Sequence, residues 1–335
     1  KTAGQKAYKE ENQMEAYQNT ALSPEERAKD LLGRMTLKEK VGQLNQRLYG
    51  FRIYERQGEE FTLTDEFKEE VERMGGLGGL YGLYRADPWA DKDEKTGIVP
   101  ELSAKAYNMV QHYVMEHSRF GIPMMMSSEC PHGHQALGGG LLPVNLAAGA
   151  TFDPALLSEG YKACGKQLKS GHVELALMSA LDMARDPRWG RNEEGYGEDP
   201  VLTGKMAGAY IRGMQGDDPK YLRCAATLKH FYGNNTEVGR GWKNSSIDPR
   251  NKYELYLEPF RRCIEDGGAE GIMTAYNKIN GTIGILNPEV TDILKKQYGL
   301  RHVVSDGGAM GLVVNLHHYF GQHAETIATA LKAGV

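Results

Sequence analysis

The feature that most constrains this 335-residue chain is a repeated alternation of short apolar runs with longer amphipathic stretches. The apolar runs predict strands at residues 79–84, 122–127, 173–180, 224–229, 271–276 and 302–305. Several intervening helices are expected to begin at an Asp-Pro or Asn-Pro pair and end at glycine, at residues 153–171, 248–268 and 287–299. Apolar strands joined by helical crossovers indicate a parallel sheet covered on both faces, either a doubly wound sheet or a (β/α)8 barrel.

The number and punctuation of these units favour the barrel. Six strand–helix units fit a TIM-like architecture. A dinucleotide-binding fold needs a glycine-rich turn between the first strand and a helix, but here the glycines of residues 75–79 precede the strand. We therefore expect an α/β chain with a (β/α)8 TIM-like barrel.

The start of the chain has two helix signals. Ser23 is followed by Glu26, and Thr36 by Glu39, so each hydroxyl has a carboxylate three residues later, as in a capping box. We expect residues 1–48 to form a helical lead-in that packs on a barrel over residues 49–335.

The bulk composition excludes some classes of protein. The formal net charge is -4, and no basic cluster indicates a nucleic-acid partner. No apolar run reaches the roughly 18 residues that a membrane helix needs, so we expect a soluble protein, cytoplasmic or secreted or periplasmic with its signal removed. The four cysteines lack C-x-x-C spacing, which indicates buried free thiols. Homo-oligomerisation is left open.

Polar residues gather where the predicted strands end, which is where barrel enzymes carry their catalytic groups. Five consecutive strand ends supply them: Glu129 with His132 and His134, Asp182 with Arg185, Lys229 with His230, Tyr276 with Asn277, and Asp306.

Asp306 ends the last apolar run and is followed by Gly307 and Gly308. A carboxylate held ionised among cations can attack an anomeric carbon, whereas the alternative is an N-cap of the next helix. The adjacent Lys229 and His230 would suit sugar hydroxyls, and the alternative for the lysine is a structural ion pair.

Two further motifs carry charged or metal-binding residue types. Residues 185–191 (RDPRWGR) hold three arginines, of which we expect one to face a ligand while the others fix the loop. Glu129, His132 and His134 raise the alternative of a metal site, but their spacing is not that of a helical zinc motif and the nearby cations oppose it. We expect the histidines to brace the loop, with no metal or cofactor.

Together, these motifs resemble glycoside hydrolase family 3, the family of β-glucosidases and β-xylosidases. The resemblance is carried by residues 22–28 (LSPEERA), 35–44 (MTLKEKVGQL), 131–134 (PHGH), 185–191 (RDPRWGR), 197–200 (GEDP), 229–231 (KHF), 276–281 (YNKING) and 304–306 (VSD). It implies that the chain is the N-terminal barrel domain, incomplete because it stops before the last strand or strands, with the following α/β domain absent.

The resemblance also implies roles for individual residues. Asp306 is the implied nucleophile. The implied sugar-binding residues are Glu129, Arg185, Lys229, His230 and Tyr276. Met273 lies three residues before Tyr276, so we expect it either to line the same pocket or to pack in the core. The acid/base is expected outside this chain, with Glu237 as an in-chain substitute. Many members have tryptophan where this chain has Gly307, so an aromatic platform is missing there.

The expected function is that of a retaining, exo-acting β-glycosidase that removes a terminal β-linked sugar through a glycosyl-enzyme on Asp306. A β-glucoside is the first choice of substrate and a β-xyloside the second. The expected partners are this glycoside and the continuation of the polypeptide or its α/β domain. The alternative is a catalytically weak or inactive sugar-binding protein on the same barrel, which Gly307 and the missing acid favour.

Overall fold

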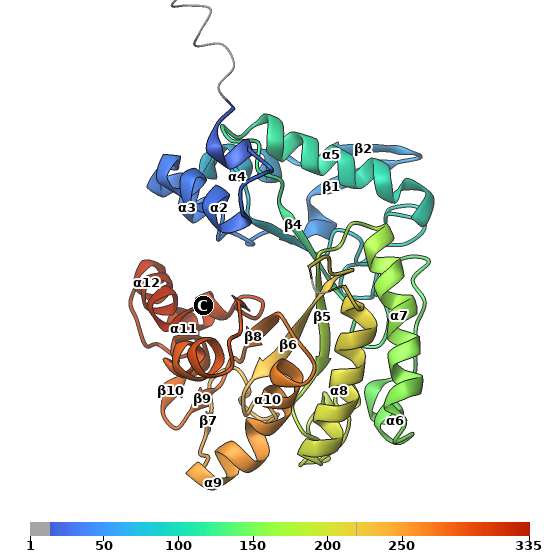
Figure 1. Cartoon of the computed structure of the whole chain (residues 1–335), viewed down its shortest axis with the longest axis vertical. Coiled ribbons are helices and arrows are strands. Elements are labelled where there is room, and N and C mark those ends of the chain that lie inside the picture. Colours follow the sequence, from blue (N-terminus) through green and yellow to red (C-terminus); the bar gives the residue numbers. More distant parts are fainter. Residues whose placement is uncertain (1–13, 219) are drawn as a thin grey trace, which may run out of the picture.

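The computed structural model describes residues 14–218 and 220–335, so residues 1–13 of the expected lead-in lie outside it. Its main element is a parallel six-stranded sheet that curls into part of a barrel (Figure 1). The strands are β3 (Gly79–Tyr81), β4 (Met125–Glu129), β5 (Leu175–Ala180), β6 (Ala225–Phe231), β8 (Gly271–Thr274) and β11 (His302–Val304). All six predicted strands are confirmed.

The order of the strands decides between the two predicted architectures. The strands of this sheet neighbour one another in chain order, and all their pairings are parallel. A doubly wound sheet reverses its order at a switch point, whereas a barrel adds each strand on the same side. The chain is therefore an incomplete (β/α) barrel, as expected.

Helices follow the strands and cover the outside of the sheet. They are α4 (Asp65–Met74), α5 (Ser103–Glu116), α6 (Asn145–Gly149), α7 (Pro154–Ser170), α8 (Pro200–Gln215), α9 (Pro249–Asn251), α10 (Glu258–Glu265), α11 (Ala309–Asn315) and α12 (His323–Ala333). The predicted starts at Asp153 and Asp248 are confirmed, because each carboxylate accepts backbone N–H bonds in the first turn. The predicted helix at 248–268 is divided by a π-helical turn, Lys252–Tyr256, and the one at 287–299 is π-helical over Val290–Gln297.

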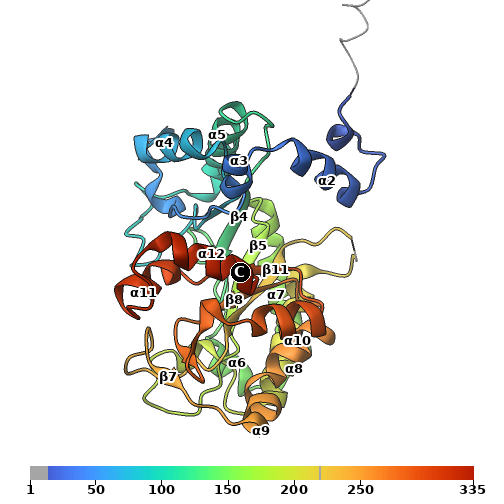
Figure 2. The same ribbon diagram turned by 90° about the vertical axis from the view of Figure 1, so that its left-hand side faces the viewer.

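The lead-in contains α2 (Pro24–Arg34) and α3 (Leu37–Gly42), and both predicted capping boxes are formed. α3 contacts α4, and the Gly42 carbonyl accepts a hydrogen bond from Gly78 just before β3. α2 has no buried residue, contacts the short 3₁₀ turn Ala16–Gln18 and lies away from the sheet (Figure 2).

Some elements had no clear sequence signal. A hairpin of β1 (Tyr54–Gln57) and β2 (Glu60–Leu63) precedes α4. A small sheet joins β7 (Asn244–Ser245), β9 (Lys278–Ile279) and β10 (Thr282–Ile283). An isolated parallel bridge pairs Tyr49 with Tyr81, which brings the segment before the hairpin alongside β3.

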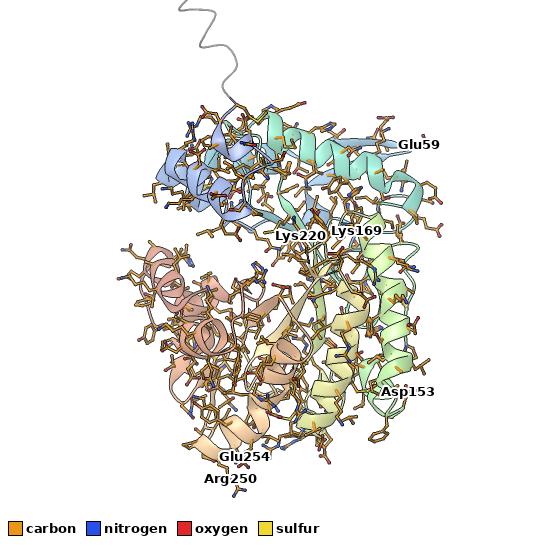
Figure 3. The ribbon with its side chains drawn as sticks, in the orientation of Figure 1. Glu59, Asp153, Lys169, Lys220, Arg250 and Glu254 are labelled. Carbon is orange, nitrogen blue, oxygen red and sulfur yellow. The ribbon has the colours of Figure 1, made fainter. Side chains whose placement is uncertain are left out.

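Charged side chains such as Asp153, Lys169, Arg250 and Glu254 lie on the outside of the molecule (Figure 3). The strands of the sheet contain few charged side chains, and β5 and β6 are buried almost throughout. All four cysteines are buried and free, as predicted. None of the helices in the described residues is both long and apolar enough to cross a membrane.

Candidate active site

The strand ends bring distant parts of the chain into one group of charged side chains. This strand-end cluster consists of Glu129, Asp182, Arg191, Glu194, Lys229, His230 and Asp306. Four of the residues predicted for the site therefore lie together, from β4, β6 and the turn after β11. Tyr276 lies beside them, because its hydroxyl donates to the Gly307 carbonyl at 2.8 Å.

Lys229 lies at the centre of the cluster with only 5% of its side chain exposed. Its Nζ lies 3.3 Å from Glu129 Oε2 and 3.4 Å from Glu194 Oε2. Burial lowers the pKa of Lys229, but the two carboxylates outweigh burial and raise the pKa above its ordinary value. The amine is therefore charged and shared between two carboxylates.

Glu194 is held from two sides. Arg191 donates to both of its oxygens, at 2.6 and 2.8 Å, and Lys229 lies on the other side. Burial raises the pKa of Glu194, yet Lys229 and Arg191 together lower it well below its usual range. The carboxylate stays ionised and fixes the two cations in place.

The contacts of His230 define its tautomer. Nδ1 lies 2.8 Å from Asp182 Oδ2, and Nε2 lies 3.2 Å from Arg191 Nη1. A guanidinium can only donate, so Nε2 accepts and the ring proton is on Nδ1, facing Asp182. The imidazole is thereby held in one orientation beside Asp306, whose Oδ2 lies 3.5 Å from Nε2.

Asp306 has one occupied and one free oxygen. Oδ1 accepts the Gly307 N–H at 2.6 Å, whereas the buried Oδ2 has no hydrogen-bond partner among the described residues. His230 Nε2 carries no proton to offer it. Burial is the largest cause that raises the pKa of Tyr276, and the charge of Asp306 is the second largest. The Tyr276 hydroxyl therefore stays protonated. A buried carboxylate oxygen without a partner requires a compensating group, such as a ligand atom.

The structure places the other predicted residues differently. Arg185 is exposed and donates to the Tyr256 hydroxyl at 3.1 Å, so Arg191 is the arginine of its loop that enters the cluster. Met273 is 6% exposed within β8. The sugar contacts predicted for Arg185 and Met273 remain predictions.

Sequence reasoning did not single out Arg191 and Glu194 as site residues. It also missed Tyr81, which donates to Glu129 Oε1 at 3.0 Å, and Arg85, whose Nη1 lies 3.8 Å from the same oxygen. Arg85 directly follows the first predicted strand, residues 79–84, so the strand-end rule could have found it. Tyr81 was missed because the observed strand β3 ends at Tyr81, three residues earlier than predicted.

The two histidines after Glu129 have separate structural contacts. His134 Nε2 lies 3.0 Å from Ser128 Oγ, and His132 Nδ1 lies 3.2 Å from the Leu142 carbonyl. Within residues 14–218 and 220–335, no three His, Cys, Asp or Glu side chains are grouped to hold a metal ion. Glu237, the in-chain candidate for the acid, accepts the Gly190 N–H at 2.9 Å.

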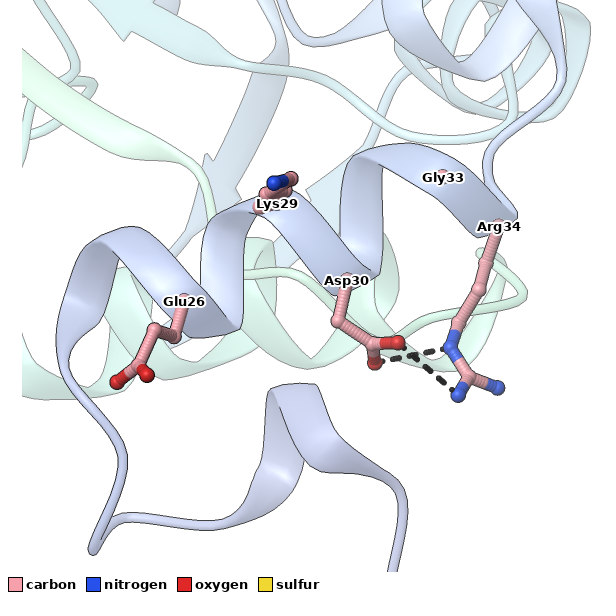
Figure 4. A pocket seen from close by; sticks show the side chains of 5 residues that line it. All are labelled: Glu26, Lys29, Asp30, Gly33 and Arg34. Atoms are coloured by element: carbon pink, nitrogen blue, oxygen red, sulfur yellow. Dashed lines mark hydrogen bonds and ion pairs between the residues drawn. The ribbon is translucent and has the colours of Figure 1, made fainter.

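Two surface hollows lie outside the cluster. One of about 550 Å³ is lined by Glu26, Lys29, Asp30, Gly33 and Arg34 of α2, where Arg34 pairs with Asp30 (Figure 4). The other, about 180 Å³, lies around Leu48 and Tyr49. Neither includes a member of the strand-end cluster.

Known proteins share this architecture. A β-glucosidase from Erythrobacter marinus superposes with a TM-score of 0.82 at 30% identity, over 96% of this chain and 41% of that one. A Listeria innocua β-glucosidase in complex with glucose gives 0.78 at 26% identity, over 93% and 41%.

Sequence comparison also finds glycosidases as relatives. A β-glucosidase from Rhizobium radiobacter is 36% identical over 64% of this chain and 25% of its own length. A putative β-xylosidase from Formosa agariphila is 29% identical over 96% and 42%. The chain thus spans less than half the length of these relatives. The model of the glycosyl hydrolase family 3 N-terminal domain matches residues 36–335, and the chain belongs to that family.

Proposed function

We propose that the protein is a retaining, exo-acting β-glycosidase with Asp306 as its nucleophile. The observation that carries the proposal is the buried, unpartnered Oδ2 of Asp306 in a cluster that contains three cationic or imidazole side chains. A carboxylate oxygen with no hydrogen bond keeps its lone pairs available for attack on an anomeric carbon.

The proposed reaction has two displacements. Asp306 Oδ2 bonds to the anomeric carbon while the bond to the leaving oxygen breaks and an acid protonates that oxygen. Water then gives a proton to the conjugate base of that acid and attacks the same carbon, and the bond to Asp306 breaks to release its carboxylate. The acid/base is proposed to come from further polypeptide, because Glu237 is occupied with the backbone of Gly190.

The other side chains of the cluster bind and orient the sugar in this proposal. Lys229 and Arg191 would donate to ring hydroxyls, and Glu129 would accept from one of them. His230 fits a positioning role, since Asp182 holds its ring and its Nε2 accepts a hydrogen bond from Arg191. The relatives' names include both β-glucosidase and β-xylosidase, so a β-glucoside is the first substrate to assay and a β-xyloside the second.

The test is Asp306→Asn in the full-length protein, assayed with nitrophenyl β-glycosides. We expect hydrolysis to fall by about a thousandfold or more while sugar binding stays measurable by calorimetry. Asp186→Asn is the matched control, because Asp186 pairs with Arg188 at the surface, and its activity should be unchanged.

A second readout addresses the mechanism directly. A 2-deoxy-2-fluoro glycoside should leave a covalent adduct on the peptide that contains Asp306, and proton NMR should show first release of the β-anomer. Unchanged turnover in Asp306→Asn, or an adduct on another residue, would refute the assignment. Sugar binding without any turnover would instead favour a sugar-binding protein, the alternative that Gly307 supports.

A further inference from the structure

The chain has three peptide bonds at which an aspartate or an asparagine precedes a glycine. They are Asp266–Gly267, Asn280–Gly281 and Asp306–Gly307. At such a bond the glycine nitrogen can attack the carbonyl carbon of the preceding side chain and close a five-membered imide, because glycine has no side chain that restricts the backbone. The contacts around each bond decide whether the folded chain allows this reaction.

Hydrogen bonds hold two of the three bonds away from the reaction. The Gly267 N–H donates to a backbone carbonyl of α10 at 3.0 Å. The Gly281 N–H donates to Asn244 Oδ1 at 2.6 Å. The Asn280 side chain exchanges two hydrogen bonds of 2.8 Å with the backbone of Ile247. These groups cannot rotate into position for attack unless their hydrogen bonds break first.

The third bond, at the turn that carries the proposed nucleophile, has the opposite arrangement. In the part of the chain that the structure describes, the Gly307 N–H has one acceptor, Asp306 Oδ1 at 2.6 Å. The turn is held through its carbonyls instead, since that of Asp306 accepts from Ala309 at 3.0 Å and that of Gly307 from Tyr276 at 2.8 Å. The nitrogen therefore lies against the carboxyl group that it would attack, a placement that favours reaction between them.

The space around the turn also differs from that around α10. A Cβ on Gly307 would have no neighbour closer than 3.9 Å, whereas one on Gly267 would lie 2.6 Å from the Cys263 carbonyl oxygen. A Cβ on Gly281 would meet nothing within 4 Å, so hydrogen bonds alone protect that bond. Only Asp306–Gly307 combines open space with a nitrogen placed on the side chain.

We propose that Asp306–Gly307 is a site of spontaneous isomerisation, at which the carboxylate of Asp306 becomes isoaspartate in the folded protein. The Gly307 nitrogen bonds to Cγ of the protonated acid, and the hydroxyl of that acid leaves as water together with the amide proton. A second water then adds to either carbonyl of the imide and returns a proton to the nitrogen. One direction restores aspartate, and the other gives isoaspartate, in which the backbone runs through Cγ.

The chemistry of this site is independent of the proposed function, but its consequence rests on that function. Isoaspartate carries its carboxylate on the former backbone carbon, so the oxygen proposed to attack the sugar is displaced. The bond would then set an intrinsic limit to the active lifetime of the enzyme.

The first experiment ages the full-length protein under native conditions in heavy-oxygen water and maps isoaspartate by peptide mass spectrometry. Synthetic peptides of the same three sequences give the unprotected rates. We expect Asp306 to isomerise within about tenfold of the rate of its peptide, with one heavy oxygen incorporated. Asp266 and Asn280 should react at least about a hundredfold more slowly than their peptides, because their hydrogen bonds must first open.

Gly307→Ala is the matched variant, because the space around Gly307 accommodates a Cβ. It should slow isomerisation of Asp306 at least about tenfold, since alanine restricts the backbone that must rotate. An unchanged Tm would show that the variant is folded. Protection of Asp306 equal to that of the other two bonds, or an unchanged rate in Gly307→Ala, would overturn the inference.

Asp306→Asn gives a second test, because its amide closes the same imide with loss of ammonia and water then restores aspartate in part of the molecules. A fresh sample should gain nitrophenyl β-glycoside hydrolysis over days, whereas Asp306→Ala should stay inactive. Adding Gly307→Ala to Asp306→Asn should slow the gain at least about tenfold. Aspartate that forms without any gain in hydrolysis would support the isomerisation site and refute the proposed nucleophile. Absence of aspartate formation would overturn the isomerisation site and leave the proposed nucleophile standing.

Discussion

At the scale of single residues, the site depends on charges that neutralise one another before any sugar arrives. Lys229 and Arg191 both carry positive charge in a buried setting, and Glu194 contacts the two of them. Removing one partner of a buried ion pair lowers the free energy of unfolding by more than the pair itself contributes to it, because the remaining buried charge is left without compensation. Glu194 should therefore matter for stability although it does not contact Asp306.

Glu194→Gln tests this role. We expect it to lower the free energy of unfolding by about 3 kcal/mol, measured by urea denaturation at pH 7. The folded-state pKa of Glu194 is lowered, so its contribution is fully present above its ordinary pKa of 4.5 and is lost as the pH falls below that value. The difference between wild type and variant should shrink on acidification.

The control for this prediction is Glu193→Gln, since Glu193 is exposed and adjacent in sequence. It should change stability by less than about 0.5 kcal/mol. A Glu194→Gln variant as stable as this control would contradict the prediction, as would a difference that grows in acid.

The residues of the cluster also show what the sequence could predict. Lys229, His230 and Asp306 end apolar runs, and the pattern of such runs is legible in the sequence, so their convergence was predictable. Arg191 and Glu194 lie in the loop between β5 and α8, where the path of the chain depends on tertiary contacts such as the hydrogen bond from Asn192 to the Asp186 carbonyl. The choice of Arg191 over Arg185 is such a tertiary effect.

At the scale of elements, the capping signals and apolar runs predicted helix starts and strands, because both are local. The β1–β2 hairpin was missed because its strands are mostly polar and only two of their eight residues are buried. The close contact of α7 with α8 was also not predictable, since it depends on which glycines meet. A Cβ on Gly213 of α8 would lie 2.4 Å from the Ser158 carbonyl oxygen of α7.

Gly213→Ala should therefore force the two helices apart and destabilise the protein by about 1–3 kcal/mol in a urea titration. Gly208 lies on the same helix, and a Cβ there would meet only the flexible end of Arg212, at 3.3 Å. Gly208→Ala should be neutral or stabilising by up to about 1 kcal/mol, because alanine favours a helix over glycine. Equal effects of the two changes would argue against the packing explanation.

At the scale of the whole molecule, the candidate site is a property of the entire sheet. Glu129 comes from β4, Lys229 and His230 from β6, Tyr276 from the segment after β8 and Asp306 from the turn after β11. No single unit of the barrel contains the cluster, so the proposed sugar site exists only when all of these strands are in place. A sugar that binds the folded state alone must then stabilise the whole domain.

We expect a bound monosaccharide at a hundred times its Kd to add about 2.7 kcal/mol to the free energy of unfolding. In a thermal melt this should raise Tm by roughly 4 °C, given the size of the domain. The alditol of the same sugar has the hydroxyls but no ring, and it should give no comparable shift. Lys229→Met should remove the response to the sugar, because the central donor of the cluster is gone. Equal shifts with sugar and alditol, or a shift that survives in Lys229→Met, would place sugar binding away from the strand ends.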